Sequence, residues 1–398
     1  MTGSRAAQAV MEGQVVFPNE HQGVSAMWGD GVSVLPAATT PLAPAVDGRP
    51  ADRAKRPVMI AVLPAAGVGH CARVNVAFST NGRWGVCLRA DDEDLTLEHW
   101  TLASEEAVCR TVPEVAVDRR THPLPLDDGR VLLLRGKGTS KAGRYACTLL
   151  RPGERGILKQ RLADIPGLGA YLVPSHNSGR LGFLVTIDDP EHSTIWRLST
   201  SPPHIELIMR IPGSLSGGMW LDGDESILAV NQSVDGCRSR GIAVDLSQRS
   251  WRGIWSISDA SIDRIVLASS RSKLVVGTTD SAGEERLGWT RLGDSTVRFP
   301  EILHRAGCVR HALALDEPGE QLLMCEVAEA VSRLLVYRPA DDRLTPIASP
   351  PGVVSTPASW AGDLVRLRFS APHQPPTLAT VRLGAKGRDE QLRAVVDN

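Results

Sequence analysis

One pattern recurs seven times along this chain, and it constrains the fold more than any other feature of the sequence. Each copy has a short strand with alternating apolar residues, a polar turn that usually contains glycine, and a second strand. The turns are centred on residues 82, 129, 179, 223, 271, 319 and 362, so successive turns are 47, 50, 44, 48, 48 and 43 residues apart. Such a regular period indicates one supersecondary unit that is used repeatedly.

Two further strands keep step with these turns. Third strands, often with an aromatic residue, are predicted at Leu97–Leu102, Arg144–Leu150, Thr194–Leu198, Gly241–Leu246, Arg286–Leu292, Arg333–Arg338 and Leu378–Leu383. Fourth strands are predicted at Ala107–Val112, Ile157–Leu162, Ile205–Ile211, Trp251–Ile257 and Val297–Leu303. Each segment is short, rich in Val, Ile, Leu and Trp, and bounded by Gly, Pro, Asp or Ser, as is typical of strands.

Four antiparallel strands in each period of 40–50 residues are typical of a β-propeller blade. One blade cannot bury both of its faces alone, whereas radial stacking buries each face against a neighbour. The sequence therefore predicts an all-β fold, a seven-bladed β-propeller of four-stranded antiparallel blades. Six tryptophans are expected to pack between the blades: Trp84, Trp100, Trp196, Trp220, Trp289 and Trp360.

The N-terminal segment leaves the number of blades open. Gly23–Pro36 contains a Gly-Asp-Gly turn, and this turn could begin an eighth blade. The next strand candidate, Val58–Leu63, follows only after a Pro/Ala/Thr-rich insert, so seven blades are favoured. We expect residues 1–66 to be a partly mobile extension and residues 67–398 to be the propeller domain. Val58–Leu63 is expected to close the ring beside a strand near Leu392–Val396, because unpaired edges are a liability.

Composition excludes several classes of protein. The chain has 44 Lys plus Arg against 45 Asp plus Glu, which is not the cationic surplus of a general nucleic-acid binder. No segment has the length and apolar character of a membrane span or a secretory signal. The seven scattered cysteines are typical of reduced thiols. We expect a monomeric cytoplasmic protein that binds neither membranes nor nucleic acid, and no cofactor or metal motif occurs.

The repeats resemble those of one known propeller class. They lack the Trp-Asp dipeptide of WD40 repeats and the double glycine of kelch repeats. Ser79–Arg83, Ser193–Leu198 and the terminal Ser359–Ser370 look like the blades of TolB and prolyl-oligopeptidase propellers. The resemblance covers residues 67–385. It implies a TolB-like propeller scaffold, which is WD40-like in its architecture although it lacks the WD40 sequence signature.

The oligopeptidases of that class also carry a C-terminal α/β-hydrolase domain with a Gly-x-Ser-x-Gly elbow. Here about 15 residues follow the last blade, and that motif does not occur in the sequence. The resemblance therefore implies a stand-alone propeller, and it does not carry over a peptidase triad.

Ligand sites of propellers lie on an axial face, where the innermost strands begin. The repeat places nine candidates there: Arg73, Arg119, Arg120, His122, Tyr171, Asp263, Arg264, Arg310 and His311. Five arginines and two histidines against one aspartate predict a cationic rim, on which guanidinium groups would bind carboxylate or phosphate. The alternative is that these arginines pair with neighbouring acids and hold the blades together.

Acidic residues gather in the loops between second and third strands. They are Asp91, Asp92, Asp94, Asp188, Asp189, Glu191, Asp235 and Asp280, with His192 beside them. Such carboxylates would suit a hard cation such as calcium. No loop has the spacing of a known calcium motif, so solvated hairpin tips are the favoured interpretation.

Two functions from different classes follow from these residues. The first is a binding scaffold that holds a protein partner or an anionic small molecule on the axial face. The second is an enzyme of small-molecule, specialised metabolism (a lyase, cyclase or hydrolase) in which arginines hold an anion and His122 or His311 moves a proton. The family resemblance adds a third possibility, a gating subunit for a separately encoded hydrolase.

Overall fold

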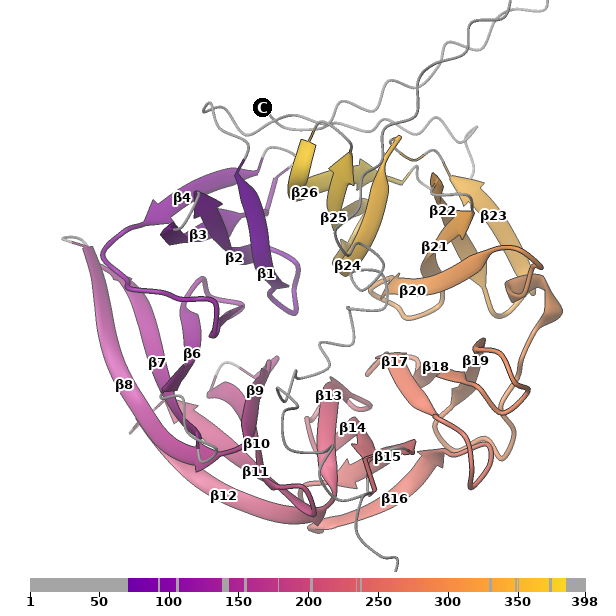
Figure 1. Cartoon of the computed structure of the whole chain (residues 1–398), viewed down its shortest axis with the longest axis horizontal. Coiled ribbons are helices and arrows are strands. Elements are labelled where there is room, and N and C mark those ends of the chain that lie inside the picture. Colours follow the sequence, from indigo (N-terminus) through magenta and orange to yellow (C-terminus); the bar gives the residue numbers. More distant parts are fainter. Residues whose placement is uncertain are drawn as a thin grey trace, which may run out of the picture. The chain divides into compact units, whose positions relative to one another are not determined.

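The computed structural model describes residues 71–383, except for residues 92–93, 105–106, 138–142, 154–155, 178, 201–202, 234, 237, 329–330, 348, 350 and 372–373. These residues form seven antiparallel sheets that stand radially around one axis (Figure 1). The predicted all-β, seven-bladed propeller is confirmed. The predicted extension 1–66, the eighth-blade alternative and the ring-closing strands lie outside the described residues. No helix in the described part of the chain is long and apolar enough to cross a membrane.

The blades follow one another in chain order. Blade 1 has β1 (Ala72–Phe78), β2 (Trp84–Asp91), β3 (Asp94–Thr101) and β4 (Val108–Val112). Blade 2 has β5 (Thr121–Pro125), β6 (Val131–Lys137), β7 (Gly143–Gly153) and β8 (Gly156–Gly167). Blade 3 has β9 (Gly169–Val173), β10 (Arg180–Asp189), β11 (His192–Thr200) and β12 (Pro203–Pro212). Blade 4 has β13 (Ser214–Trp220), β14 (Ile227–Ser233), β15 (Ser239–Asp245) and β16 (Ser250–Trp255).

The remaining blades complete the ring. Blade 5 has β17 (Arg264–Ala268), β18 (Leu274–Thr279) and β19 (Arg286–Arg291). Blade 6 has β20 (Val309–Leu315), β21 (Leu322–Ala328), β22 (Val331–Arg338) and β23 (Arg343–Ile347). Blade 7 has β24 (Val353–Ala361), β25 (Leu364–Ala371) and β26 (Gln374–Arg382). Each sheet is ordered from the innermost strand outward, and every first-to-second turn falls where the repeat predicted it.

One predicted strand is wrong. Val297–Leu303 does not form the fourth strand of blade 5; it makes a single bridge, in which the backbone N–H groups of Trp289 and Arg298 donate to each other's carbonyls at 2.9 and 2.8 Å. A one-turn 3-10 helix, Glu301–Leu303, follows at once. Pro300 stops the ladder, because it has no backbone N–H and its fixed φ suits the start of a helix.

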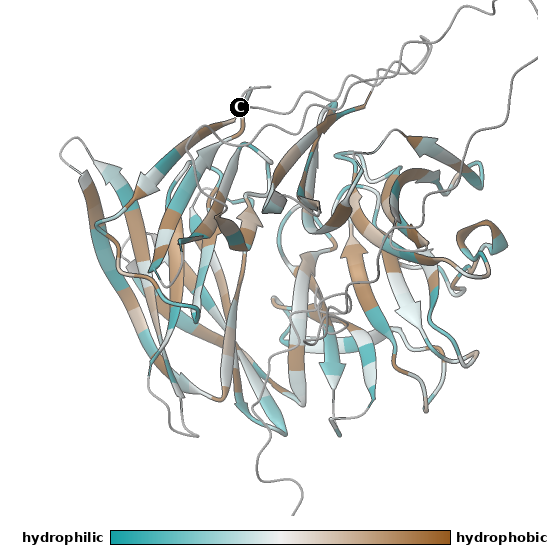
Figure 2. Ribbon diagram, turned by 45° about the horizontal axis from the view of Figure 1, so that its top comes forward, coloured by the Kyte–Doolittle hydropathy of each residue, from teal (hydrophilic) through white to brown (hydrophobic). Residues whose placement is uncertain are grey.

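The hydrophobic core lies between the blades, with one buried cluster at each of the seven junctions. Leu88, Leu97 and Leu133 belong to the junction of blades 1 and 2, and Phe183 packs edge to face against Trp220 between blades 3 and 4. Figure 2 shows the resulting alternation of hydrophobic and hydrophilic residues along the strands. As predicted, tryptophans contribute to these junctions.

Polar side chains join blade 7 to blade 1 where the ring closes. Arg73 of β1 donates to the hydroxyl of Thr377 on β26 at 3.1 Å. Arg366 of β25 is 2% exposed and donates to the backbone carbonyls of Leu102 and Ser104. In the part of the chain that the structure describes, each blade is built from consecutive strands, so blades 7 and 1 do not share a strand. Side-chain contacts therefore connect these two blades.

Candidate functional site

The nine predicted site residues all lie at the same axial end of their blades, which we call the entry face. Arg73, His122, Tyr171, Arg264, Arg310 and His311 occupy the first three positions of innermost strands. Arg119, Arg120 and Asp263 lie in the segments directly before β5 and β17. The opposite end, which we call the turn face, carries the turns between first and second strands. The repeat thus placed the candidates at one end, although their surroundings differ.

Arg73 is part of a buried ion pair in blade 1. Its Nε donates to a carboxylate oxygen of Glu98 on β3 at 2.7 Å, and the Glu98 side chain is 1% exposed. Burial opposes the charge of Arg73, yet the carboxylate of Glu98 raises the arginine pKa above its usual value. Arg89 approaches the same carboxylate at 3.9 Å. Arg73 therefore supports the blade and is not free to clamp a ligand.

Arg310 has the same kind of partner in blade 6. Its Nε donates to Glu326 of β21 at 2.9 Å, and Arg305 lies 3.7 Å from the other carboxylate oxygen. The side chains of Arg310 and Glu326 are 9% and 4% exposed. The alternative interpretation, arginines that pair with acids, thus holds for Arg73 and Arg310, but their partners lie on strands of the same blade and not in neighbouring loops.

Three of the five predicted arginines remain exposed: Arg119, Arg120 and Arg264. A tight loop before β5 presents the first two, because Asp118 accepts the backbone N–H of Arg120 at 3.0 Å and the hydroxyl of Thr121 at 2.8 Å. The side chain of Arg120 lies over Gly136, where an added Cβ would meet it at 3.7 Å. These contacts hold the backbone of both arginines in a defined position at the rim.

Asp263 has a structural role beside Arg264. It is fully buried and accepts the backbone N–H of Ile257 at 2.6 Å and the hydroxyl of Ser261 at 2.9 Å. Its own backbone N–H donates to the carbonyl of Ser239. The carboxylate thereby fixes the loop that leads from blade 4 into β17 and presents Arg264 to solvent.

The two candidate histidines lie on the innermost strands of different blades. His122 lies in blade 2 and His311 in blade 6, both half-buried. Burial lowers the pKa of each imidazole; Asp118 opposes this shift at His122, and Glu285 opposes it at His311. A lowered pKa favours the neutral ring at neutral pH, which is the form of a general base. Tyr171 is half-buried too and packs against the cluster between blades 3 and 4.

Several of the loop acids pair locally, within their own blades, whereas Asp92 lies outside the described residues. Asp91 binds Arg89 at 2.6 Å, Asp189 binds Arg210 at 3.1 Å, and Asp235 binds Arg238 at 2.5 Å. In blade 5, Asp280 accepts the backbone N–H of Ile262 at 2.7 Å. Among the described residues, no group of three or more His, Cys, Asp or Glu side chains could hold a metal ion.

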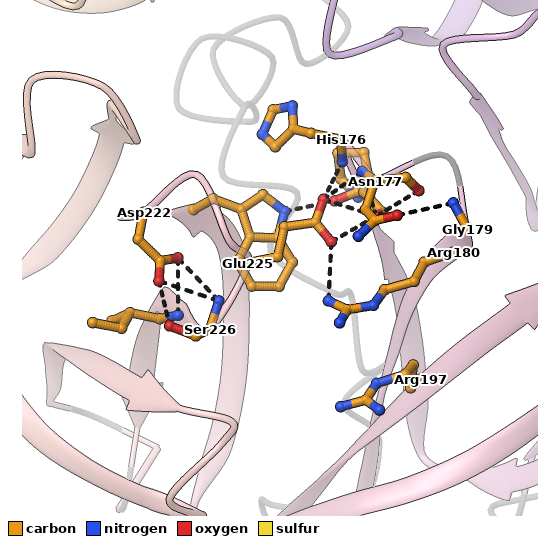
Figure 3. A network of polar contacts seen from close by, with 12 residues as sticks. His176, Asn177, Gly179, Arg180, Arg197, Asp222, Glu225 and Ser226 are labelled. Carbon is orange, nitrogen blue, oxygen red and sulfur yellow. Dashed lines mark hydrogen bonds and ion pairs between the residues drawn. The ribbon is translucent and has the colours of Figure 1, made fainter.

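Three buried acids were not among the predicted site residues. Glu98 and Glu326 lie within strands whose other residues are largely apolar. An acidic residue at a buried position of such a strand is the sequence signal that could have identified them. A third buried acid, Glu225, lies on the turn face (Figure 3). Its carboxylate crosses from blade 4 to blade 3, where it accepts the hydroxyl of Ser175 at 2.7 Å and the backbone N–H groups of His176 and Asn177.

Comparison with known proteins identifies the fold. No protein-family model matches the chain, and no curated protein matches it. Among solved structures, the β-propeller domain of the Trilobed protease from Pyrococcus furiosus is 11% identical, with a TM-score of 0.54 over 83% of this chain and 100% of that chain. Prolyl oligopeptidase B from Galerina marginata is 11% identical, with a TM-score of 0.60 over 81% of this chain and 50% of that chain.

A puromycin-hydrolysing peptidase from Mycobacterium tuberculosis is 13% identical, with a TM-score of 0.53 over 77% of this chain and 51% of that chain. The chain thus spans about half the length of these two peptidases and the full length of the Trilobed protease propeller domain. At such low identity the likeness concerns the fold alone. The described residues therefore form a seven-bladed propeller whose fold is similar to the propellers of these peptidases, and no hydrolase domain lies within them.

Proposed function

We propose that this chain is a binding module whose entry face holds an acidic region of a protein partner. The observation that carries this proposal is the position of the exposed arginines. Arg119 and Arg120 belong to blade 2 and Arg264 to blade 5, three blades further along the seven-bladed ring (Figure 1). A protein surface laid over the entry face would span the axis and contact both blades at once. Complementary charge of this kind favours fast and selective association.

The enzymatic alternative has less support. It needs a histidine and an anion clamp that converge on one substrate, but Arg310, the arginine beside His311, is engaged by Glu326. Similarity to the peptidases supports only the fold, so a gating role for a separate hydrolase has no observation in its favour.

A charge-reversal variant tests the proposal. Affinity capture with the intact chain, followed by titration of the captured protein, is expected to show binding that Arg119→Glu/Arg120→Glu/Arg264→Glu weakens at least tenfold. The reason is that reversal replaces three attractive contacts with repulsive ones. The matched control is Arg83→Glu/Arg249→Glu/Lys273→Glu, which reverses three exposed cations at the turn face.

Equal loss of binding in the control variant, or undiminished binding by the entry-face variant, would contradict the proposal. A small anionic ligand would give a different result: it would raise the thermal midpoint of the isolated chain. At 100 times its dissociation constant, such a ligand adds about 2.7 kcal/mol to the free energy of unfolding.

A further inference from the structure

Blade 2 carries a concentration of positive charge that the neutral balance of the chain conceals. Residues 131–167, which include β6, β7 and β8, contain eight Lys or Arg and two Asp or Glu. The whole chain, by contrast, has 44 Lys or Arg and 45 Asp or Glu. This part of the ring is thus strongly cationic, and the axial candidates do not account for it.

The strand register gathers several of these cations on one face. Lys137 pairs with Arg144 across β6 and β7. On β8, Lys159 pairs with Leu150 and Arg161 with Thr148. Because Leu150 belongs to the core between blades 1 and 2, this row faces blade 1. We call the row Lys137, Arg144, Lys159 and Arg161 the blade 2 cationic row.

One carboxylate serves most of this row. Asp164 contacts Lys137 at 3.3 Å and Arg144 at 3.0 Å, and it also binds Arg161. These three cations remain 46%, 57% and 59% exposed. Lys159 donates to the backbone carbonyl of Glu114, which does not neutralise its charge. The row therefore keeps a positive excess on side chains that remain exposed.

The outermost of these strands, β8, forms an edge of the sheet, and this edge is able to pair with another strand. β8 has 12 residues, the most of any described strand, and it is the last strand of its sheet. Leu158 on this strand is 66% exposed. An edge of this length presents backbone N–H and C=O groups to which an extended peptide can add.

We propose that the outer edge of blade 2 binds an extended acidic peptide segment of another protein, which adds as a strand to β8. Side chains on one face of a strand are two residues, or about 6.6–6.8 Å, apart. Alternate carboxylates of such a peptide therefore match the spacing of Lys159 and Arg161. Lys159 and Arg161 lie on the outermost strand of the blade, whereas the entry-face arginines precede innermost strands, and this inference does not depend on the proposed function.

A peptide fits better than a single-stranded nucleic acid. Bases bind to protein surfaces chiefly by stacking on aromatic rings beside a cationic groove. Tyr145, the aromatic residue of these strands, pairs with Ile165 toward blade 3, and its hydroxyl donates to the carbonyl of Leu168 at 3.1 Å. Among the described residues of β6 to β8, the cationic row therefore has no ring beside it for stacking.

Fluorescence anisotropy with the full chain tests the inference. The probe is a labelled ten-residue peptide that alternates glutamate with threonine. We expect it to bind, and we expect Lys159→Glu/Arg161→Glu to weaken that binding at least tenfold, with Lys159→Gln/Arg161→Gln as a milder second variant. The control Arg252→Glu/Arg343→Glu reverses two exposed cations on the outer strands β16 and β23 and should change the affinity less than threefold.

Two more probes separate strand addition from simple attraction. A peptide of equal charge with prolines at two central threonines lacks the backbone N–H groups for pairing and should bind at least tenfold more weakly. Equal binding of the proline peptide, or equal loss in the control variant, would overturn strand addition at β8. Tighter binding of a labelled oligothymidylate than of the acidic peptide would overturn the choice of partner.

Discussion

At the scale of single residues, buried acids organise this propeller. Glu98 and Glu326 each hold an arginine inside a blade, and Glu225 ties the turns of blades 3 and 4 together. A buried carboxylate is costly unless its oxygens are paired and hydrogen-bonded. Each of these acids meets that condition with partners from other strands or another blade. Two predicted ligand residues, Arg73 and Arg310, are therefore structural partners of acids.

Glu225 provides the residue-scale prediction. Glu225→Ala should lower the free energy of unfolding by about 3 kcal/mol, because the backbone N–H groups of His176 and Asn177 lose their buried acceptor. Glu225 also has a φ of +56°. Glu225→Gly should consequently be about 1 kcal/mol less destabilising than the alanine variant, since glycine adopts this conformation without a steric cost. Urea unfolding measures both values, and wild-type stability in the alanine variant would refute this role for the carboxylate.

At the scale of elements, the blades differ in how completely they are built. Five described sheets have four strands, whereas blades 5 and 7 have three. In blade 5 the segment Val297–Leu303 is long enough to form a strand. It makes only one β-bridge, between Arg298 and Trp289, before the 3-10 helix begins. Local apolar character predicted a strand there, and the missing N–H of Pro300 prevented one.

This difference predicts a local difference in stability. Amide hydrogens of residues 297–303 should exchange at least tenfold faster than those of β16, which is the complete fourth strand of the preceding blade. The reason is that β16 pairs with β15 along its length, whereas residues 297–303 share a single pair of ladder hydrogen bonds. Hydrogen exchange read by mass spectrometry decides the matter, and equal protection of both segments would show that the segment forms a full strand.

At the scale of the whole molecule, half-buried histidines should make the propeller sensitive to acid. Burial lowers the pKa of His99, His122, His304 and His311 below the usual value. The unfolded chain, with a histidine pKa of about 6.5, then binds more protons than the folded chain. The stabilisation is thus present above pH 6.5 and is lost as the pH falls toward the lowered values.

We therefore expect the free energy of unfolding to decrease between pH 7.5 and pH 5.5. His122→Gln/His311→Gln should reduce that decrease, because two of the groups no longer titrate. His176→Gln, which replaces an exposed histidine at the turn face, is the control for the substitution itself. Urea unfolding at both pH values gives the comparison, and an identical decrease in the wild type and the double variant would contradict the assignment.

The sequence by itself determined the architecture, because strand alternation and turn residues act locally and recur with one period. Residues 82, 129 and 319 all mark first-to-second turns, and glycine at each of them has a φ between +67° and +83° that other residues rarely adopt. The same period placed all nine site candidates at one axial end. The period could not predict which of the charged side chains are buried and which are exposed.

The tertiary structure determines which of the five arginines are buried and which are exposed. Arg73 meets Glu98, 25 residues away, and Thr377, 304 residues away, while Arg119, Arg120 and Arg264 stay exposed. In a linear pattern all five arginines look alike. Whether a guanidinium is buried against a carboxylate or exposed depends on which strands of which blades pack together, and only the closed ring brings these groups into contact.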